Sequence, residues 1–158
     1  MNPGDKVEDF TLKNQDGKDV SLSDFKDKPV VLFFYPRADT PGCTIESCGF
    51  RDAFTKFKKK GIVVLGISRD TVAAQKKFKD KYDLPYDLLA DDKMTLINRY
   101  DLIKPKNMYG KLVKGVKRTT YLISPDEGKG QRLIHIFENV KPEGHAEEVL
   151  ALVKGEKK

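Results

Sequence analysis

The sequence predicts an α/β fold in which a mixed central β-sheet is flanked by helices on both faces. Two apolar runs of strand length, residues 29–35 and 62–68, are each followed by apolar residues at helical spacing. Such units form parallel strands joined by right-handed crossovers. A late pair of strands at 119–123 and 132–140 is typical of an antiparallel hairpin, so the sheet is expected to be mixed. At 158 residues, we expect one domain over residues 1–158.

The first elements expected are a hairpin, a buried strand and a long helix. Residues 10–12 and 20–22 flank turn residues at 14–17, the pattern of two short strands joined by a turn. The buried strand follows, because its apolar run is continuous rather than alternating. Residues 43–60 then carry aromatic side chains at helical spacing, and Gly61 is expected to end this helix.

The middle of the chain continues the strand–helix alternation. A helix is expected at 71–82, with Thr71 as its N-cap. A shorter strand at 85–90 and a short helix at 94–100 follow.

The last third begins with a loop rich in lysine and glycine around residues 104–106. The late hairpin follows, and its turn is expected at 124–131. A helix at 144–153 and a polar tail close the chain. This order of elements is compatible with a thioredoxin-like fold and also with a flavodoxin-like one, and neither fold alone determines a function.

The composition is that of a soluble globular protein. Charged residues make up 34% of the chain and hydrophobic residues 39%, which excludes general disorder and a membrane protein. No positively charged start precedes an apolar stretch, and the longest apolar run, 30–35, is too short to cross a bilayer. We therefore expect a cytoplasmic location with no membrane association.

The chain is basic, with 30 Lys and Arg against 24 Asp and Glu and a net charge of +6. Lysine clusters at 56–60 and 76–79 raise the alternative of a nucleic-acid-binding module. Solvated helix faces and cationic helix ends explain these clusters better, so no nucleic-acid partner is expected. No phosphate-binding glycine loop is present, so no nucleotide cofactor is indicated.

The informative segment surrounds Cys43. Only two cysteines and two histidines are present, so a disulfide scaffold is excluded and a zinc site would need all four residues to converge. Cys43 follows a buried strand and opens a helix, where unpaired N–H groups and the helix dipole favour an anion such as a thiolate. Gly42 allows close approach of a ligand, and the Thr40 hydroxyl can donate to the sulfur or bridge to a bound oxygen. The alternative is that Cys43 is an inert, packed cysteine and Thr40 an ordinary N-cap.

Cys48 lies five residues after Cys43. On a shared helix the two residues are separated by roughly 7.5 Å along the axis and point to nearly opposite faces. A disulfide needs Cα atoms within about 7 Å and converging side chains, so the pair can bond only if the first turns unwind. A permanent bridge is disfavoured, a transient redox bond is allowed, and a small packed apolar residue remains the alternative for Cys48.

At this point the sequence resembles the peroxiredoxins. Pro36, Thr40 and Cys43 match the family signature P-x-x-x-T-x-x-C, and Glu46 matches the acidic residue that follows it. The position of Cys48 is similar to that of the resolving cysteine in the bacterioferritin-comigratory, or Q-type, branch. The resemblance extends over nearly the whole chain and includes residues 3–5, 10–12, 108–110, 115, 118–123 and 144–146. One departure is the segment at 124–131, which is longer than the family's usual short turn.

The resemblance implies a thioredoxin-like fold and reduction of hydrogen peroxide and organic hydroperoxides, with no cofactor and no metal. Cys43 would be the peroxidatic thiolate and would be oxidised to a sulfenic acid. Cys48 would condense with it as an intramolecular disulfide, which a thioredoxin-type protein would reduce. A monomer is expected.

The same resemblance implies roles for the neighbours of Cys43. Thr40 and the backbone N–H groups of Gly42 and Cys43 would stabilise the developing charge on the peroxide oxygens. Arg118 matches the family's active-site arginine and would favour the thiolate, although a solvated arginine is the alternative for this residue type.

Two further assignments complete the expected site. Glu46 would orient the arginine, and an ordinary acidic residue in a helix's first turn is equally consistent with its position. Pro36 would shape the loop and shield the sulfur from water.

Two other enzyme classes compete with this interpretation. A dithiol–disulfide oxidoreductase usually carries C-x-x-C, and the spacing here is C-x-x-x-x-C. A cysteine hydrolase would need a histidine base, but His135 lies in an alternating apolar stretch and His145 starts a helix. We expect structural roles for both histidines.

Overall fold

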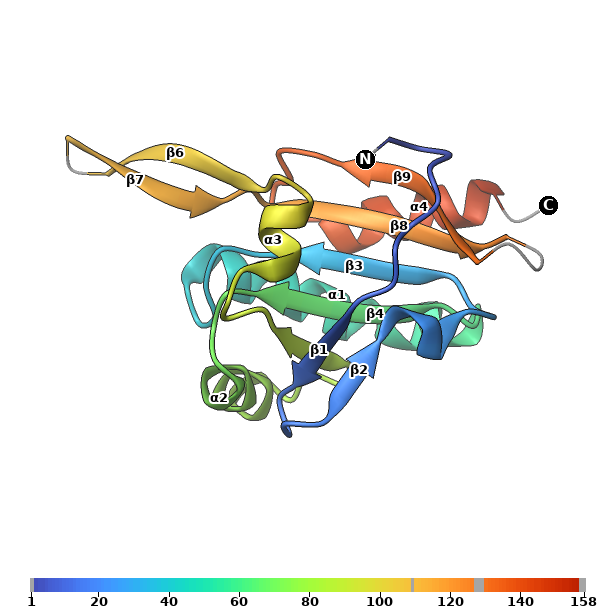
Figure 1. Cartoon of the computed structure of the whole chain (residues 1–158). Coiled ribbons are helices and arrows are strands. Elements are labelled where there is room, and N and C mark those ends of the chain that lie inside the picture. Colours follow the sequence, from blue (N-terminus) through green and yellow to red (C-terminus); the bar gives the residue numbers. More distant parts are fainter. Residues whose placement is uncertain (1, 109, 127–129, 157–158) are drawn as a thin grey trace.

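A computed structural model describes residues 2–108, 110–126 and 130–156 of the chain (Figure 1). Seven strands form one mixed sheet in the order β2-β1-β5-β4-β3-β8-β9, and β6 and β7 form a separate two-stranded sheet. The strands are β1 (Thr11–Asn14), β2 (Asp19–Ser21), β3 (Val30–Phe34), β4 (Val63–Ser68), β5 (Asp87–Ala90), β6 (Ile103–Met108), β7 (Lys111–Val116), β8 (Thr119–Pro125) and β9 (Gln131–Phe137). The helices are α1 (Pro41–Lys59), α2 (Val72–Tyr82), α3 (Thr95–Arg99) and α4 (His145–Glu156), with a 3-10 turn η1 at Leu22–Phe25.

The centre of the sheet is parallel and its sides are antiparallel. Strands β3, β4 and β5 pair in parallel, as the two apolar runs predict. Strand β8 pairs antiparallel with β3, and β1 pairs antiparallel with β5. The expected mixed sheet is confirmed.

Helices cover both faces of the sheet, because alternate residues of the central strand face opposite ways. Val31 and Phe33 of β3 pack in one apolar cluster with residues of α1, α2 and α4. Val30 and Leu32 pack on the other face with residues of α3 and η1. Figure 1 shows α1 and α4 behind the sheet and α3 in front of it. All five residues of β3 are fully buried, so the strand lies at the centre of the core.

One element is wrong in the sequence prediction. The loop expected around residues 104–106 is an antiparallel hairpin, β6–β7, whose register runs from Ile103 opposite Val116 to Met108 opposite Lys111. Figure 1 shows this hairpin projecting from the body of the molecule. The strands carry lysines, a proline and a glycine in place of an alternating apolar pattern, so they lack the signal by which a strand is recognised.

Other boundaries differ by a few residues. The turn expected at 124–131 is shorter, because β8 runs to Pro125 and β9 begins at Gln131, and residues 127–129 of this turn lie outside the described residues. The last helix continues to Glu156, beyond the predicted 153.

Across the described part of the chain, no helix combines the length and the apolar character needed to span a membrane.

Candidate active site

The register between β3 and β8 assembles the site. Phe34, the last residue of β3, lies opposite Thr119, the first residue of β8. Arg118 precedes Thr119 in the chain, so it lies beside the loop that leaves β3 and leads into α1. Two segments about 75 residues apart in sequence are therefore adjacent, and the hydrogen bonds of the ladder fix their relative position.

Cys43 is the third residue of α1 and its side chain is fully buried. The first intrahelical bond runs from Thr44 N–H to the Thr40 carbonyl at 2.8 Å, so the N–H groups of Gly42 and Cys43 precede the helical ladder. The guanidinium of Arg118 donates from Nη2 to Cys43 Sγ at 3.3 Å. The sulfur thus has two sources of positive potential, the helix terminus and the arginine.

Arg118 also contacts Glu46. Its Nη1 donates to Glu46 Oε1 at 2.7 Å, with the arginine side chain 16% exposed and the carboxylate fully buried. One planar guanidinium therefore bridges Cys43 and Glu46, a geometry that a lysine cannot reproduce. Burial lowers the pKa of Arg118, but the neighbouring Cys43 and Glu46 outweigh it and raise that pKa.

Burial dominates the environment of the Glu46 carboxyl and raises its pKa to about 7, although Arg118 pulls in the opposite direction. Its second oxygen, Oε2, is buried without a hydrogen-bond partner among the described residues. Such a carboxyl is costly to bury, and its contact with Arg118 is consistent with a role in orienting the guanidinium.

Gly42 permits the approach of Arg118. A Cβ at this position would lie 3.1 Å from Arg118 Nη2 and 3.4 Å from Cγ of Pro142. The sequence suggests that this glycine makes room for a ligand, whereas in the structure it makes room for the arginine that contacts Cys43.

Thr40 is the N-cap residue of α1 and has extended backbone angles. Its hydroxyl donates to the carbonyl of Arg37 at 2.9 Å and not to the helix or to Cys43. A hydroxyl has one proton, and that of Thr40 is already donated. Toward a ligand, the Thr40 oxygen can therefore only accept a hydrogen bond. Of the two roles expected for this hydroxyl, donation to the sulfur is not seen, and contact with a bound oxygen stays a prediction.

Pro36 and Arg118 line a cavity of about 310 Å³ whose other walls are Gly115, Val116, Lys117, Asn139 and Val140. The cavity leads to the guanidinium from the side of β7 and the segment after β9. Pro36 and Arg118 thus line the same cavity, and the expected part of Pro36 in shaping the loop and shielding the sulfur from water stays a prediction.

Cys48 lies on the same continuous helix as Cys43, and both thiols are free. Cys48 is half-buried, whereas Cys43 has no exposed surface. The intact helix keeps the two residues unbonded, as the five-residue spacing predicts.

Neither histidine forms a hydrogen bond with Cys43 in the described part of the chain. His145 is buried and its ring nitrogens contact Thr120 Oγ1 at 2.8 Å and Glu148 Oε1 at 2.9 Å. Burial lowers the pKa of His145, and its ring packs edge-on against Phe50 of α1. It therefore joins α4 to β8 and α1. No group of three or more His, Cys, Asp or Glu side chains in the described part of the chain is arranged to hold a metal ion.

Sequence reasoning missed the residues that hold the loop before Cys43. Asp70 accepts from the Ala38 N–H at 2.7 Å, and Asp39 accepts from Lys81 Nζ at 2.9 Å and from the Tyr82 hydroxyl at 3.0 Å. These partners are 32 to 43 residues apart in the chain, so no local motif could indicate them.

A buried thiol near the N-terminus of a helix, bridged by an arginine to a glutamate of the same helix, is an arrangement suited to a thiol-dependent peroxidase. The chain belongs to the AhpC/TSA family, whose model matches residues 3–129. It is 47% identical to the putative peroxiredoxin bcp of Coxiella burnetii over 147 residues, which cover 93% of this chain and 95% of that protein.

Solved structures agree with this membership. A cysteine-to-serine variant of PrxQ from Xylella fastidiosa superposes with a TM-score of 0.91 at 33% identity and covers all of this chain and 98% of its own. The bacterioferritin comigratory protein of Xanthomonas campestris, described for its alkyl peroxide reduction activity, has a TM-score of 0.85 at 36% identity, with 94% and 92% of the two chains covered. The peroxiredoxin resemblance, the thioredoxin-like fold and the activity, reduction of peroxides by an oxidoreductase, are confirmed.

The substitution Glu46→Gln is expected to change the pH dependence of stability. A carboxyl whose pKa rises from 4.5 to about 7 on folding keeps its proton in the folded state across that interval and loses it in the unfolded state. Its contribution to the free energy of unfolding therefore falls as the pH rises from about 4.5 to 7. Urea unfolding at several pH values should show the variant gaining stability relative to the wild type across this interval. A difference that is constant with pH would contradict the assignment.

Proposed function

We propose that Cys43 is the peroxidatic residue and that Arg118 activates it. The observation that carries this proposal is the bridge from the guanidinium to both Cys43 Sγ and Glu46 Oε1. The thiolate attacks one peroxide oxygen, the O–O bond breaks, and the leaving oxygen departs as hydroxide or alkoxide and takes up a proton. The products are a Cys43 sulfenic acid and water or an alcohol.

The residues around the sulfur have complementary tasks in this step. The N–H groups of Gly42 and Cys43 point from the helix terminus and donate to the oxygen on which charge develops. The Thr40 hydroxyl donates its proton to the Arg37 carbonyl, which supports a role as acceptor for the O–H of a hydroperoxide. Arg118 then faces the thiolate and the reacting oxygens together.

Cys48 is the proposed resolving residue. Its thiol sulfur attacks the sulfenic sulfur of Cys43, hydroxide leaves and combines with the thiol proton, and a disulfide and water result. Because both cysteines lie on α1, the helix must open at its N-terminal turns before this bond forms. A thioredoxin-type protein then supplies the two electrons and two protons that restore both thiols.

The proposal also covers the full set of site residues, the substrates, the location and the oligomeric state. The site residues are Cys43, Cys48, Thr40, Arg118, Pro36 and Glu46, with Gly42 beside the substrate. Hydrogen peroxide and organic hydroperoxides are the proposed substrates, since alkyl peroxide reduction is described for the Xanthomonas campestris relative. We place the enzyme in the cytoplasm as a monomeric single domain over residues 1–158.

Mass spectrometry after one equivalent of peroxide tests the resolving step. The reduced protein should lose two hydrogens, and proteolysis without reductant should release a peptide in which Cys43 and Cys48 are crosslinked. A stable gain of one oxygen at Cys43, with a free Cys48 thiol, would contradict the assignment of Cys48. Crosslinks between two chains would contradict the intramolecular bond.

A further inference from the structure

The loop that precedes Cys43 is fastened to the end of α2. Asp39 lies immediately before the N-cap of α1 and has a left-handed backbone with φ of 60°. Its carboxylate accepts from Lys81 Nζ at 3.1 and 2.9 Å and from the Tyr82 hydroxyl at 3.0 Å. A left-handed conformation is uncommon for a residue other than glycine and persists where its surroundings hold it.

Helix α1 is held again near the end of its second turn, by the last residue of α2 and by Tyr86 in the segment between α2 and β5. Arg51 donates from Nη1 to the Tyr82 carbonyl at 2.9 Å, and the buried Tyr86 donates from its hydroxyl to the Ser47 carbonyl at 2.6 Å. From Ser47 onward α1 is therefore held, and its Phe50 lies in the core. The part of α1 that remains to open lies before Ser47 and contains Cys43 and Glu46, whose side chains both contact Arg118.

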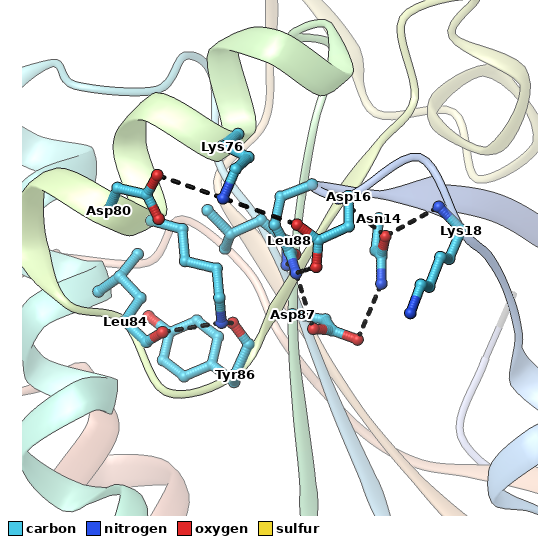
Figure 2. A network of polar contacts seen from close by, with 11 residues as sticks. Asn14, Asp16, Lys18, Lys76, Asp80, Leu84, Tyr86, Asp87 and Leu88 are labelled. Carbon is cyan, nitrogen blue, oxygen red and sulfur yellow. Dashed lines mark hydrogen bonds and ion pairs between the residues drawn. The ribbon is translucent and has the colours of Figure 1, made fainter.

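The support at α2 is itself fixed to the sheet. Figure 2 shows Lys76 of α2 between Asp80 on its own helix and Asp16 in the turn between β1 and β2, at 3.3 and 3.7 Å. Inside the core, Gln75 accepts from the Tyr35 hydroxyl at 2.6 Å and donates to the Leu89 carbonyl at 2.8 Å. Opening of α1 therefore moves the loop relative to α2 and breaks or strains the contacts of Asp39.

We propose that Asp39, held by Lys81 and Tyr82, is a latch that keeps the N-terminal turns of α1 closed in the dithiol form. The latch positions Cys43 for the reaction with peroxide and opposes the opening that Cys48 needs for disulfide formation. This inference rests on the proposed roles of Cys43 and Cys48. Asp39, Lys81 and Tyr82 act through the helix and do not touch the substrate.

Two conservative variants weaken the latch without removing a core side chain. Asp39→Asn removes the charge that Lys81 contacts and keeps a residue type that tolerates a left-handed backbone. Tyr82→Phe removes only the hydroxyl that donates to Asp39, while the Tyr82 carbonyl still accepts from Arg51. Asp80→Asn is the matched control, because it breaks the exposed Lys76–Asp80 pair on the same helix.

Rapid-quench kinetics should separate the two chemical steps. Both latch variants should form the Cys43–Cys48 disulfide about two- to five-fold faster, the range expected when an exposed pair is lost. Sulfenic acid formation should stay within about two-fold of the wild type, because the closed form still predominates. The disulfide potential should become more negative by about 9 to 21 mV, which is the same factor converted at about 29.6 mV per tenfold.

The control variant shows whether faster disulfide formation comes from loss of the latch or from a general destabilisation of α2. Asp80→Asn should leave both steps and the potential unchanged. Unchanged disulfide formation in both latch variants, or equal acceleration in the control, would overturn the latch while leaving the peroxidase assignment intact. Loss of peroxide reduction in the wild type itself would instead remove the proposed function.

Discussion

Replacing Cys43 by serine is expected to reduce peroxide consumption to the background rate. A serine hydroxyl is similar in size to the thiol but stays protonated near neutral pH, so neither the N-terminus of α1 nor Arg118 can turn it into the attacking anion. The fold should survive, because the side chain fills nearly the same buried volume. Peroxide consumption with a thioredoxin-type reducing system measures the effect.

Cys48→Ser is the matched variant for this experiment. It keeps Cys43 and its arginine, so it should consume one equivalent of peroxide and then stop, with sulfenic or more oxidised sulfur at Cys43. Full turnover in the Cys43 variant would contradict the peroxidatic assignment. Full turnover in the Cys48 variant would contradict only the resolving one.

Replacing Arg118 by methionine is expected to slow sulfenic acid formation by about 10²- to 10³-fold, the usual effect of removing one donor from the site of charge development. The guanidinium contacts the attacking sulfur at 3.3 Å and the buried Glu46 at 2.7 Å, so the variant loses both the charge beside the thiolate and the partner of the carboxylate. Single-turnover kinetics under excess peroxide measure this step directly.

Arg118→Lys separates charge from geometry. Lysine keeps the positive charge but its single ammonium cannot bridge two acceptors as the planar fork does, so its rate should lie between those of the methionine variant and the wild type. Arg99→Met is the control, since that arginine contacts the exposed carbonyl of Asp9 on the other face of the sheet. A wild-type rate in Arg118→Met would remove this residue from the mechanism.

The fold was predictable where burial leaves a pattern in the sequence. All of β3 is apolar because both faces of the strand are covered, and α1 shows aromatic residues at helical spacing because one of its faces packs on the sheet. The hairpin β6–β7 lies outside the main sheet and leaves no such pattern. Its pairing depends on the backbone register, which composition does not encode.

The same distinction applies to the residues of the site: those close together in the sequence could be predicted, and those brought together by the fold could not. Thr40, Cys43 and Glu46 lie within seven residues, so their spacing on one helix start could be read directly. Arg118 could be assigned only through the family resemblance, because its contact with Glu46 spans 72 residues and depends on how β8 pairs with β3. The attachment of Asp39 to Tyr82 had no indicator at all, since exposed aspartates and lysines are common.

The two thiols differ in exposure, and we expect this difference to determine which reagents can reach each of them. Cys43 has no surface open to solvent, whereas Arg118, which contacts its sulfur, lines a cavity of about 310 Å³, so we expect only a small oxidant such as a hydroperoxide to reach the sulfur. Cys48 is half-buried, and a bulky disulfide or alkylating compound meets it first. If Cys43 is the peroxidatic residue, as we propose, the sulfur that reacts with peroxide is the less accessible of the two, and we expect larger electrophiles to modify Cys48 first.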